Sequence, residues 1–83
     1  MSFDEIDRAL LRKLYHYGYI GHRHTESNNA LRGFPKDRGK EVRKSLKKLV
    51  RLGLVMQYPS TGEIHISLNP RLIAEVREII GEN

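Results

Sequence analysis

The segment from residue 37 to residue 55 restricts the fold of this chain more than any other part of the sequence. Its apolar residues recur at steps of 4, 3 and 1 and so share one face of a helix: Val42, Leu46, Leu49 and Val50. Gly53 is a natural helix-ending residue, and the β-rich run LVMQY follows it at once. The segment therefore predicts an amphipathic helix that leads directly into a strand.

The length and composition of the chain set the scale of this fold. With 83 residues, the chain has room for one small domain, which we take to span residues 1–83. The absence of cysteine excludes disulfides and thiolate metal sites. No apolar run approaches the roughly 20 residues of a membrane span, and the acidic stretch MSFDEIDR is unlike a signal peptide. We therefore expect a cytoplasmic protein that makes no membrane contact.

Two helices and a short strand are expected before this segment. Ser2 and Glu5 have the spacing of a capping box, which predicts a first helix that starts at the residue after Ser2 and ends at Gly18. Residues 19–24 are aromatic at their start and predict a short strand or extended link. Thr25 is a good N-cap and predicts a short second helix, which ends before the turn GFP.

A hairpin and a last helix are expected after the segment. Alternating apolar residues in 64–68, separated from 54–58 by the turn sequence PSTGE, predict two antiparallel strands. Asn69 predicts the N-cap of a final helix, with Pro70 at its first position. The apolar face of this helix consists of Leu72, Ile73, Val76, Ile79 and Ile80. Because a chain of this length has a small core, we expect this face and the first helix to form a homodimer interface.

The positive charge of the chain lies almost wholly in one segment. The net charge is +5, but residues 36–51 alone carry +6 and the remaining residues −1. Eight basic residues produce this charge: Lys36, Arg38, Lys40, Arg43, Lys44, Lys47, Lys48 and Arg51. Such a concentration indicates a polyanionic partner, although a charged run also occurs on an ordinary solvated helix face.

The sequence VRKSLKKLVRLGLV, residues 42–55, resembles the core of winged helix-turn-helix DNA-binding domains. The recurring pattern Val-x3-Leu-x2-Leu-x3-Gly-Leu-Val falls here on Val42, Leu46, Leu49, Gly53, Leu54 and Val55. The chain also resembles the small stand-alone winged-helix proteins that are common in archaea. This resemblance implies an α+β winged-helix fold, in which a helix, a short strand, a helix-turn-helix, a β-hairpin wing and a C-terminal helix follow one another.

The same resemblance implies a function. We expect double-stranded DNA binding through a recognition helix at about residues 37–52, in a transcriptional regulator or a small chromatin-associated factor. The eight basic residues above are the expected contacts of this helix, and the wing tip is expected at Ser60, Thr61 and Gly62. Because winged-helix domains also act as scaffolds, the alternative is a protein–protein interaction module within a larger complex.

The residue types of the third helix predict how it binds DNA. At about 100° per residue, the face opposite the apolar stripe carries Lys40, Lys44, Lys48 and Arg51. Lysine is a point charge that suits phosphates, whereas Arg43 offers a bidentate fork for guanine. The sequence therefore supports duplex binding better than tight sequence reading.

Two histidines one residue apart, His22 and His24, allow three interpretations. On a short strand they point the same way, and with His65 they provide three nitrogen ligands for a metal, but no carboxylate is evident beside them. In the second interpretation, the start of the second helix contacts phosphate through Arg23, Thr25, Ser27 and Asn28. In the third, the histidines are purely structural. We expect no bound metal and no cofactor.

Catalytic motifs are absent from the sequence. It contains no cysteine, no Gly-x-Ser-x-Gly motif and no phosphate loop. The acidic residues at positions 4, 5 and 7 begin a helix, where they interact favourably with its dipole. We therefore do not expect an enzyme.

Overall fold

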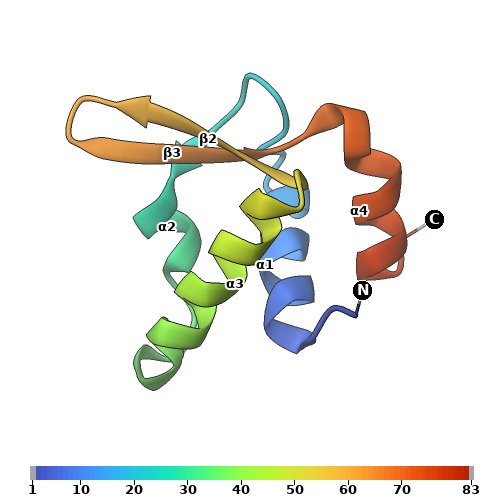
Figure 1. Ribbon diagram of the computed structural model, residues 1–83, viewed down its shortest axis with the longest axis horizontal. Helices are drawn as coiled ribbons and strands as arrows, with labels where there is room; N and C mark the ends of the chain where they lie inside the picture. Colours follow the sequence, from blue (N-terminus) through green and yellow to red (C-terminus); the bar gives the residue numbers. More distant parts are fainter. Residues whose placement is uncertain (1, 83) are drawn as a thin grey trace.

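The computed structural model describes residues 2–82, which form an α+β fold of four α-helices and a three-stranded antiparallel sheet (Figure 1). The elements are α1 (Glu5–His16), β1 (Thr25–Glu26), α2 (Ser27–Leu31), α3 (Gly39–Arg51), β2 (Val55–Ser60), β3 (Glu63–Leu68) and α4 (Ile73–Ile80). Two 3₁₀ helices, η1 (Lys36–Arg38) and η2 (Pro70–Leu72), precede α3 and α4. The α+β class expected from the sequence is confirmed.

The sheet has the strand order β1-β3-β2, with β2 and β3 forming the expected hairpin. Ser60 pairs with Glu63, so the hairpin turns through two residues, and Gly62 there has a φ of 77° that suits glycine. Pro59 lies within β2, which is tolerated because β2 is an edge strand. Both strands extend further toward the turn than the sequence pattern predicts.

The first helix begins two residues later than predicted. Its N-cap is Asp4, whose Oδ1 accepts a 2.8 Å hydrogen bond from the backbone N–H of Asp7. Asp7 Oδ2 accepts a 3.0 Å bond from the backbone N–H of Asp4, which completes a capping box. The prediction of a box between Ser2 and Glu5 is therefore wrong, because the carboxylates of Asp4 and Asp7 occupy both capping positions instead.

Residues 19–24 do not form the predicted strand. Within them, only Ile20 makes a β-bridge, in parallel with Leu68, before the chain turns at Gly21. The strand that joins the sheet is β1, where Thr25 faces Ile66. The prediction that Thr25 is the N-cap of the second helix is therefore wrong. Thr25 is a buried strand residue, and its Oγ1 accepts a 2.9 Å hydrogen bond from Asn29.

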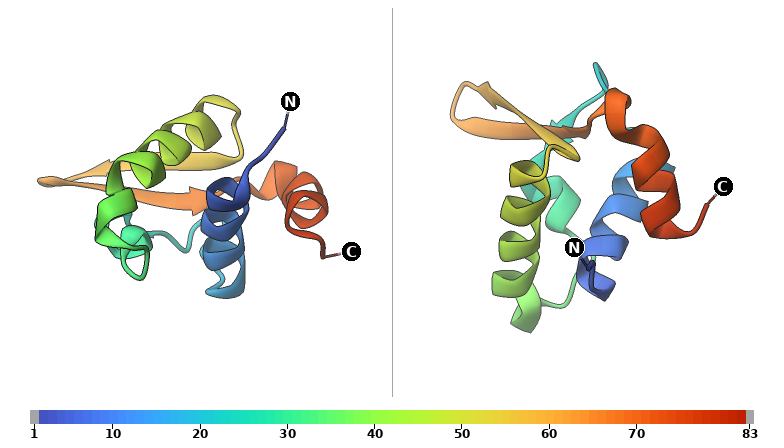
Figure 2. Two further views of the ribbon diagram at one scale, coloured as in Figure 1. Left: turned by 90° about the horizontal axis from the view of Figure 1, so that it is seen from below. Right: turned by 45° about the vertical axis from the view of Figure 1, so that its right-hand side comes forward.

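Helix α1 lies at the centre of the molecule, between α3 and α4 and against β3 (Figure 2). All four α-helices and the strands β2 and β3 contribute to the core cluster, which comprises Leu10, Leu11, Leu14, Ala30, Leu46, Leu49, Leu54, Val55, Ile66, Leu68, Val76 and Ile80, while Thr25 of β1 is buried at the sheet edge. The end of α2 is tied to α1 by Lys13, which donates a hydrogen bond to the carbonyl of Arg32. This packing holds α2, α3 and the hairpin along one side of α1.

The core also covers part of the face that we expect to mediate dimerisation. Leu11, Val76 and Ile80 are buried within the chain itself. Leu72, Ile73 and Ile79 are only partly buried and pack against the edge of the core. The apolar surface that remains for a second copy is therefore narrower than the sequence alone indicates.

The described residues extend over 35 × 30 × 21 Å along their principal axes, with a Cα radius of gyration of 11.8 Å. A compact chain of this length is expected to have a radius of gyration of about 12 Å. Among residues 2–82, none of the helices has the length and apolar character needed to cross a membrane.

Candidate functional site

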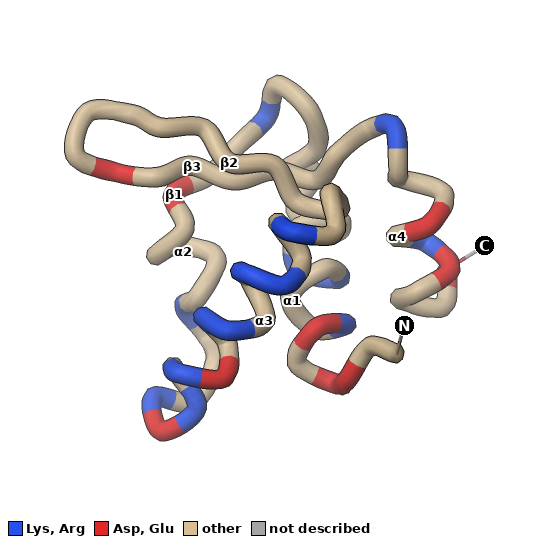
Figure 3. Tube along the Cα trace, viewed as in Figure 1, with Lys and Arg blue, Asp and Glu red and all other residues tan. Residues whose placement is uncertain are grey.

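The outer face of α3 carries an exposed group of basic side chains. The helix turns Val42, Ser45, Leu46 and Leu49 inward. The opposite side exposes Lys40, Arg43, Lys44, Lys47 and Arg51, which we call the basic face. Figure 3 shows lysine and arginine following one another along the length of α3. None of these five side chains forms an ion pair with another residue in the described range 2–82.

Lys48 does not belong to this face. Its Nζ donates a 2.7 Å hydrogen bond to Oδ2 of Asp7 on α1, and the Lys48 side chain is only 26% exposed. Ser45 Oγ donates to Asp7 Oδ1 at 2.5 Å. The predicted DNA contact at Lys48 is thus replaced by an ion pair that joins α3 to α1, because the helix turns this lysine toward a buried carboxylate rather than toward solvent.

Asp7 remains a carboxylate although it is only 1% exposed. Burial on its own would raise the pKa of Asp7, because a charged group is poorly solvated there. The hydrogen bonds from Lys48, Ser45 and the backbone N–H of Asp4 outweigh this effect, and the pKa of Asp7 is lowered from its ordinary value. The acidic residue that the sequence indicates only as a helix-dipole partner is therefore also the centre of an interhelical network.

Of the other predicted contacts on this segment, Arg38 is also paired. Its Nη2 lies 2.9 Å from Oε2 of Glu41, one turn along. The hydrogen bond from Arg38 lowers the pKa of Glu41, and the pair is exposed, so it adds little to stability. Lys36, at the start of η1, is exposed and beside the groove described next.

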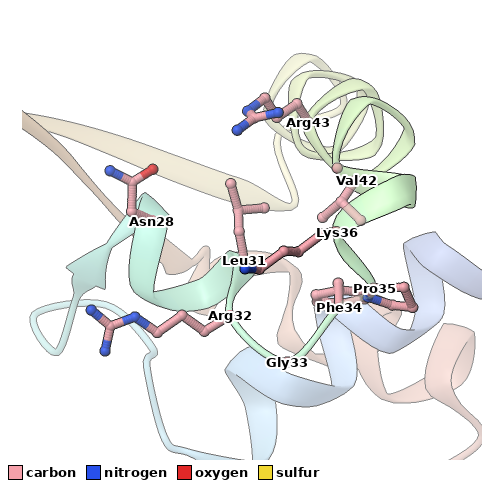
Figure 4. A pocket seen from close by; sticks show the side chains of 10 residues that line it. Asn28, Leu31, Arg32, Gly33, Phe34, Pro35, Lys36, Val42 and Arg43 are labelled. Carbon is pink, nitrogen blue, oxygen red and sulfur yellow. The ribbon is translucent and has the colours of Figure 1, made fainter.

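A groove of about 500 Å³ separates α2 from α3 (Figure 4). Leu31, Phe34 and Val42 supply apolar surface to this groove, and three basic side chains also line it: Arg32, Lys36 and Arg43. Arg43 is exposed rather than covered by the neighbouring helix. Arg32 was not predicted as a site residue, since it lies outside the basic run of residues 36–51. Through Arg32 and Lys36, the groove therefore adds positive charge next to the basic face.

The residues around the start of α2 divide into two groups. Thr25 is buried and bonded to Asn29, so it does not present its hydroxyl to a phosphate. Ser27 is half-buried, whereas Arg23 and Asn28 are exposed. Helix α2 has five residues and no side-chain N-cap. The phosphate contact predicted here thus reduces to Arg23, Ser27 and Asn28.

The tip of the hairpin is exposed but not basic. Ser60, Thr61 and Gly62 are all exposed, as a wing tip would be. Between this tip and the start of α2 lies a groove of about 430 Å³, and Glu26 and Glu63 line it. These carboxylates repel phosphate, so the hairpin offers less to a DNA backbone than α3 does.

His22 and His24 have different surroundings in the structure. His22 is exposed and takes no part in the hydrogen bonds of the described residues. His24 Nδ1 lies 2.9 Å from His65 Nδ1, and the ring of Tyr58 lies 5.1 Å from that of His24. The Tyr58 hydroxyl donates to the carbonyl of Gly21 at 3.2 Å, which fixes this loop on the sheet. The sheet therefore holds this loop, and of its two histidines only His24 contacts His65.

Two glutamates adjoin this histidine pair. Glu26, Glu63 and His65 each offer a ligand atom, and these atoms lie within 4.8 Å of one another. The neighbouring Glu26 raises the pKa of Glu63, because the protonated carboxyl group of Glu63 hydrogen-bonds to Glu26 and the two groups repel when both are charged. Neither glutamate was predicted as a site residue. The alternation of Glu63 and His65 was visible in the sequence, but the pairing of β1 with β3 was not.

Comparisons of the chain with known protein families, with curated proteins and with solved structures found no match. The function is therefore inferred from the chemistry of these surfaces.

Proposed function

We propose that the protein is a winged-helix domain that binds double-stranded DNA through the basic face of α3. The order of elements supports the winged-helix assignment, because α2 and α3 are followed by a β2–β3 hairpin and a final helix. In this assignment, α2 and α3 are the helix-turn-helix and the hairpin is the wing. The strand before α2 is β1, which is shorter than the predicted segment of residues 19–24 and lies after it.

The observation that carries the proposal is the basic face itself. Five exposed cations without acidic partners among the described residues stand on one side of a single helix. Mutual repulsion makes such a group unfavourable for folding alone, whereas a polyanion neutralises it. A helix of about 10–12 Å diameter also matches the major groove of DNA, which is about 12 Å wide.

The residue types favour binding that depends mainly on the DNA backbone. Lys40, Lys44 and Lys47 place point charges that suit phosphates, and Arg43 is the residue best equipped to read a guanine edge. The hairpin tip lacks a basic side chain, so it is not proposed to insert into the minor groove. Such a protein serves as a transcriptional regulator or a small chromatin-associated factor.

The second candidate function is that of a protein-interaction module within a larger complex. One observation favours it: an apolar groove of about 370 Å³, lined by Phe3, Leu52, Leu54, Leu72 and Ile79 together with two glutamates. This groove adjoins α4 and lies apart from the basic face. It is compatible with DNA binding elsewhere on the molecule, so the two functions are separable.

Fluorescence anisotropy with a labelled duplex of random sequence tests the proposal. The combined Lys44→Ala and Lys47→Ala substitutions should weaken binding strongly, because they remove two phosphate contacts. The combined Arg71→Ala and Arg77→Ala substitutions are the matched control, since they remove two exposed cations outside the basic face. Equal losses in both variants would indicate a nonspecific effect of net charge. Absence of binding by the wild-type protein at low salt would favour the interaction-module function.

A further inference from the structure

The paired strands β1 and β3 bring together three side chains that suit a metal ion. We propose that Glu26, Glu63 and His65 bind a divalent transition-metal ion of the zinc type. His24 is not a ligand in this proposal but holds the ligand ring of His65. None of these residues belongs to the basic face, so zinc binding can be measured without DNA.

The register of the sheet explains why these residues meet. Glu26 on β1 and His65 on β3 are direct cross-strand partners. Glu63 precedes His65 by two residues on β3, and side chains two apart on a strand share a face. Glu26, which is distant in the sequence, is therefore placed beside Glu63 and His65 by hydrogen-bonded backbone rather than by flexible loops.

The distances are compatible with a coordination site, in which a metal ion would replace the hydrogen bond that Glu26 and Glu63 share. His65 Nε2 lies 3.8 Å from Oε2 of Glu63, which is too long for a hydrogen bond. The ligand atoms of all three residues lie within 4.8 Å of one another. Zinc–nitrogen and zinc–oxygen bonds of about 2.0–2.2 Å place neighbouring ligand atoms roughly 3–3.5 Å apart. Small rotations of two exposed glutamate side chains close this difference.

The hydrogen bond between the two histidines prepares His65 to act as a ligand. The 2.9 Å contact between His24 Nδ1 and His65 Nδ1 requires a hydrogen on one nitrogen and a lone pair on the other. When His65 donates, its Nε2 carries a lone pair that faces the carboxylates. Metal-bound histidines ordinarily donate their second ring N–H to a neighbouring acceptor, and His24 supplies that acceptor here. The ring of Tyr58 packs against His24 and limits its movement.

The ligand set also indicates which ion would bind. One imidazole nitrogen and two carboxylates suit zinc and its neighbours, whereas magnesium and calcium prefer oxygen ligands alone. Three protein ligands leave at least one position for water, unlike a closed structural zinc site. The expectation of no bound metal relied on the lack of carboxylates beside the histidines, and the fold supplies two of them.

Isothermal titration of the purified, metal-free protein with zinc chloride tests the site, with cobalt(II) absorbance as a second readout of coordination. The wild-type protein should bind one equivalent of zinc. His65→Ala and Glu26→Gln should each weaken binding by at least about tenfold. His24→Ala should weaken it by about 10–100-fold, as removal of such a supporting partner generally does. Because Glu26 is exposed, its glutamine variant should keep the fold, and the thermal midpoint without metal checks this.

His22→Ala is the matched control, since His22 lies in the same loop but outside the cluster. It should leave zinc affinity unchanged. The site is refuted if wild-type protein binds no zinc at tens of micromolar. It is equally refuted if Glu26→Gln and Glu63→Gln both bind as tightly as wild type, or if His22→Ala loses as much affinity as His65→Ala.

Discussion

Lys48 Nζ lies 2.7 Å from Asp7 Oδ2, so an ion pair with a carboxylate that is 1% exposed joins α3 to α1. Lys48→Ala leaves this carboxylate buried without its cation. We expect the free energy of unfolding to fall by about 1–3 kcal/mol, the cost of leaving a buried acceptor without one of its donors. Lys44→Ala, on the exposed side of the same helix, should change it by less than about 0.5 kcal/mol. Urea unfolding of both variants measures the difference, and equal effects would contradict the structural role of Lys48.

The lowered pKa of Asp7 predicts a specific loss of stability in acid. A carboxyl group whose pKa is lower in the folded state stabilises the fold fully above its ordinary pKa, which is 3.8 for aspartate. This contribution is lost as the pH falls from there through the lowered pKa. Asp7→Asn removes the titrating group, so the gap in unfolding free energy between wild type and variant should shrink as the pH falls from about 4 through the lowered pKa. Denaturation at several pH values tests this, and a constant gap would count against it.

Arg43 should differ from the lysines of the same helix. Its side chain is exposed, so Arg43→Ala should leave the unfolding free energy nearly unchanged. On a preferred DNA site the substitution should cost about 1–3 kcal/mol of binding free energy, and less on other sequences. Selection of bound fragments from a random duplex pool, followed by anisotropy on selected and scrambled duplexes, makes this comparison. A uniform loss on all sequences would instead identify Arg43 as a phosphate contact.

Dimerisation should depend on the partly exposed apolar residues of the C-terminal region. Leu72 and Ile79 line the apolar groove beside α4, and a second copy would cover them. Two-fold symmetric regulators place their recognition helices about 34 Å apart on one face of DNA. Light scattering at tens of micromolar should give twice the chain mass, and Ile79→Lys should halve it. A monomeric mass for the wild-type protein would exclude this interface.

The helical pattern predicts the core positions of α3 because they repeat at a regular spacing. Val42, Leu46 and Leu49 were expected on the apolar face, and all three are buried. The short strand was misplaced because its sequence has no such regular spacing. A two-residue strand has almost no pattern of its own, and its position is decided by pairing of Thr25 with Ile66, 41 residues away.

Site residues that depend on contacts between distant parts of the chain were also not predictable from the sequence. A helical wheel places Lys48 opposite the apolar stripe, but it contains no information about Asp7 on another helix. The pairing of Glu26 with His65 depends on strand register, which a single sequence does not reveal. The exposed face of α3 was predictable because it depends on local periodicity alone.

The salt dependence of DNA affinity tests the central claim most directly. Each phosphate contact releases counterions, so the log of affinity should fall linearly with the log of salt concentration, with a slope of about −0.9 per contact. Lys44→Ala should weaken binding on every duplex and make this slope shallower by roughly 1. If instead Lys44→Ala binds as tightly as wild type with the same slope, the basic face of α3 does not contact DNA.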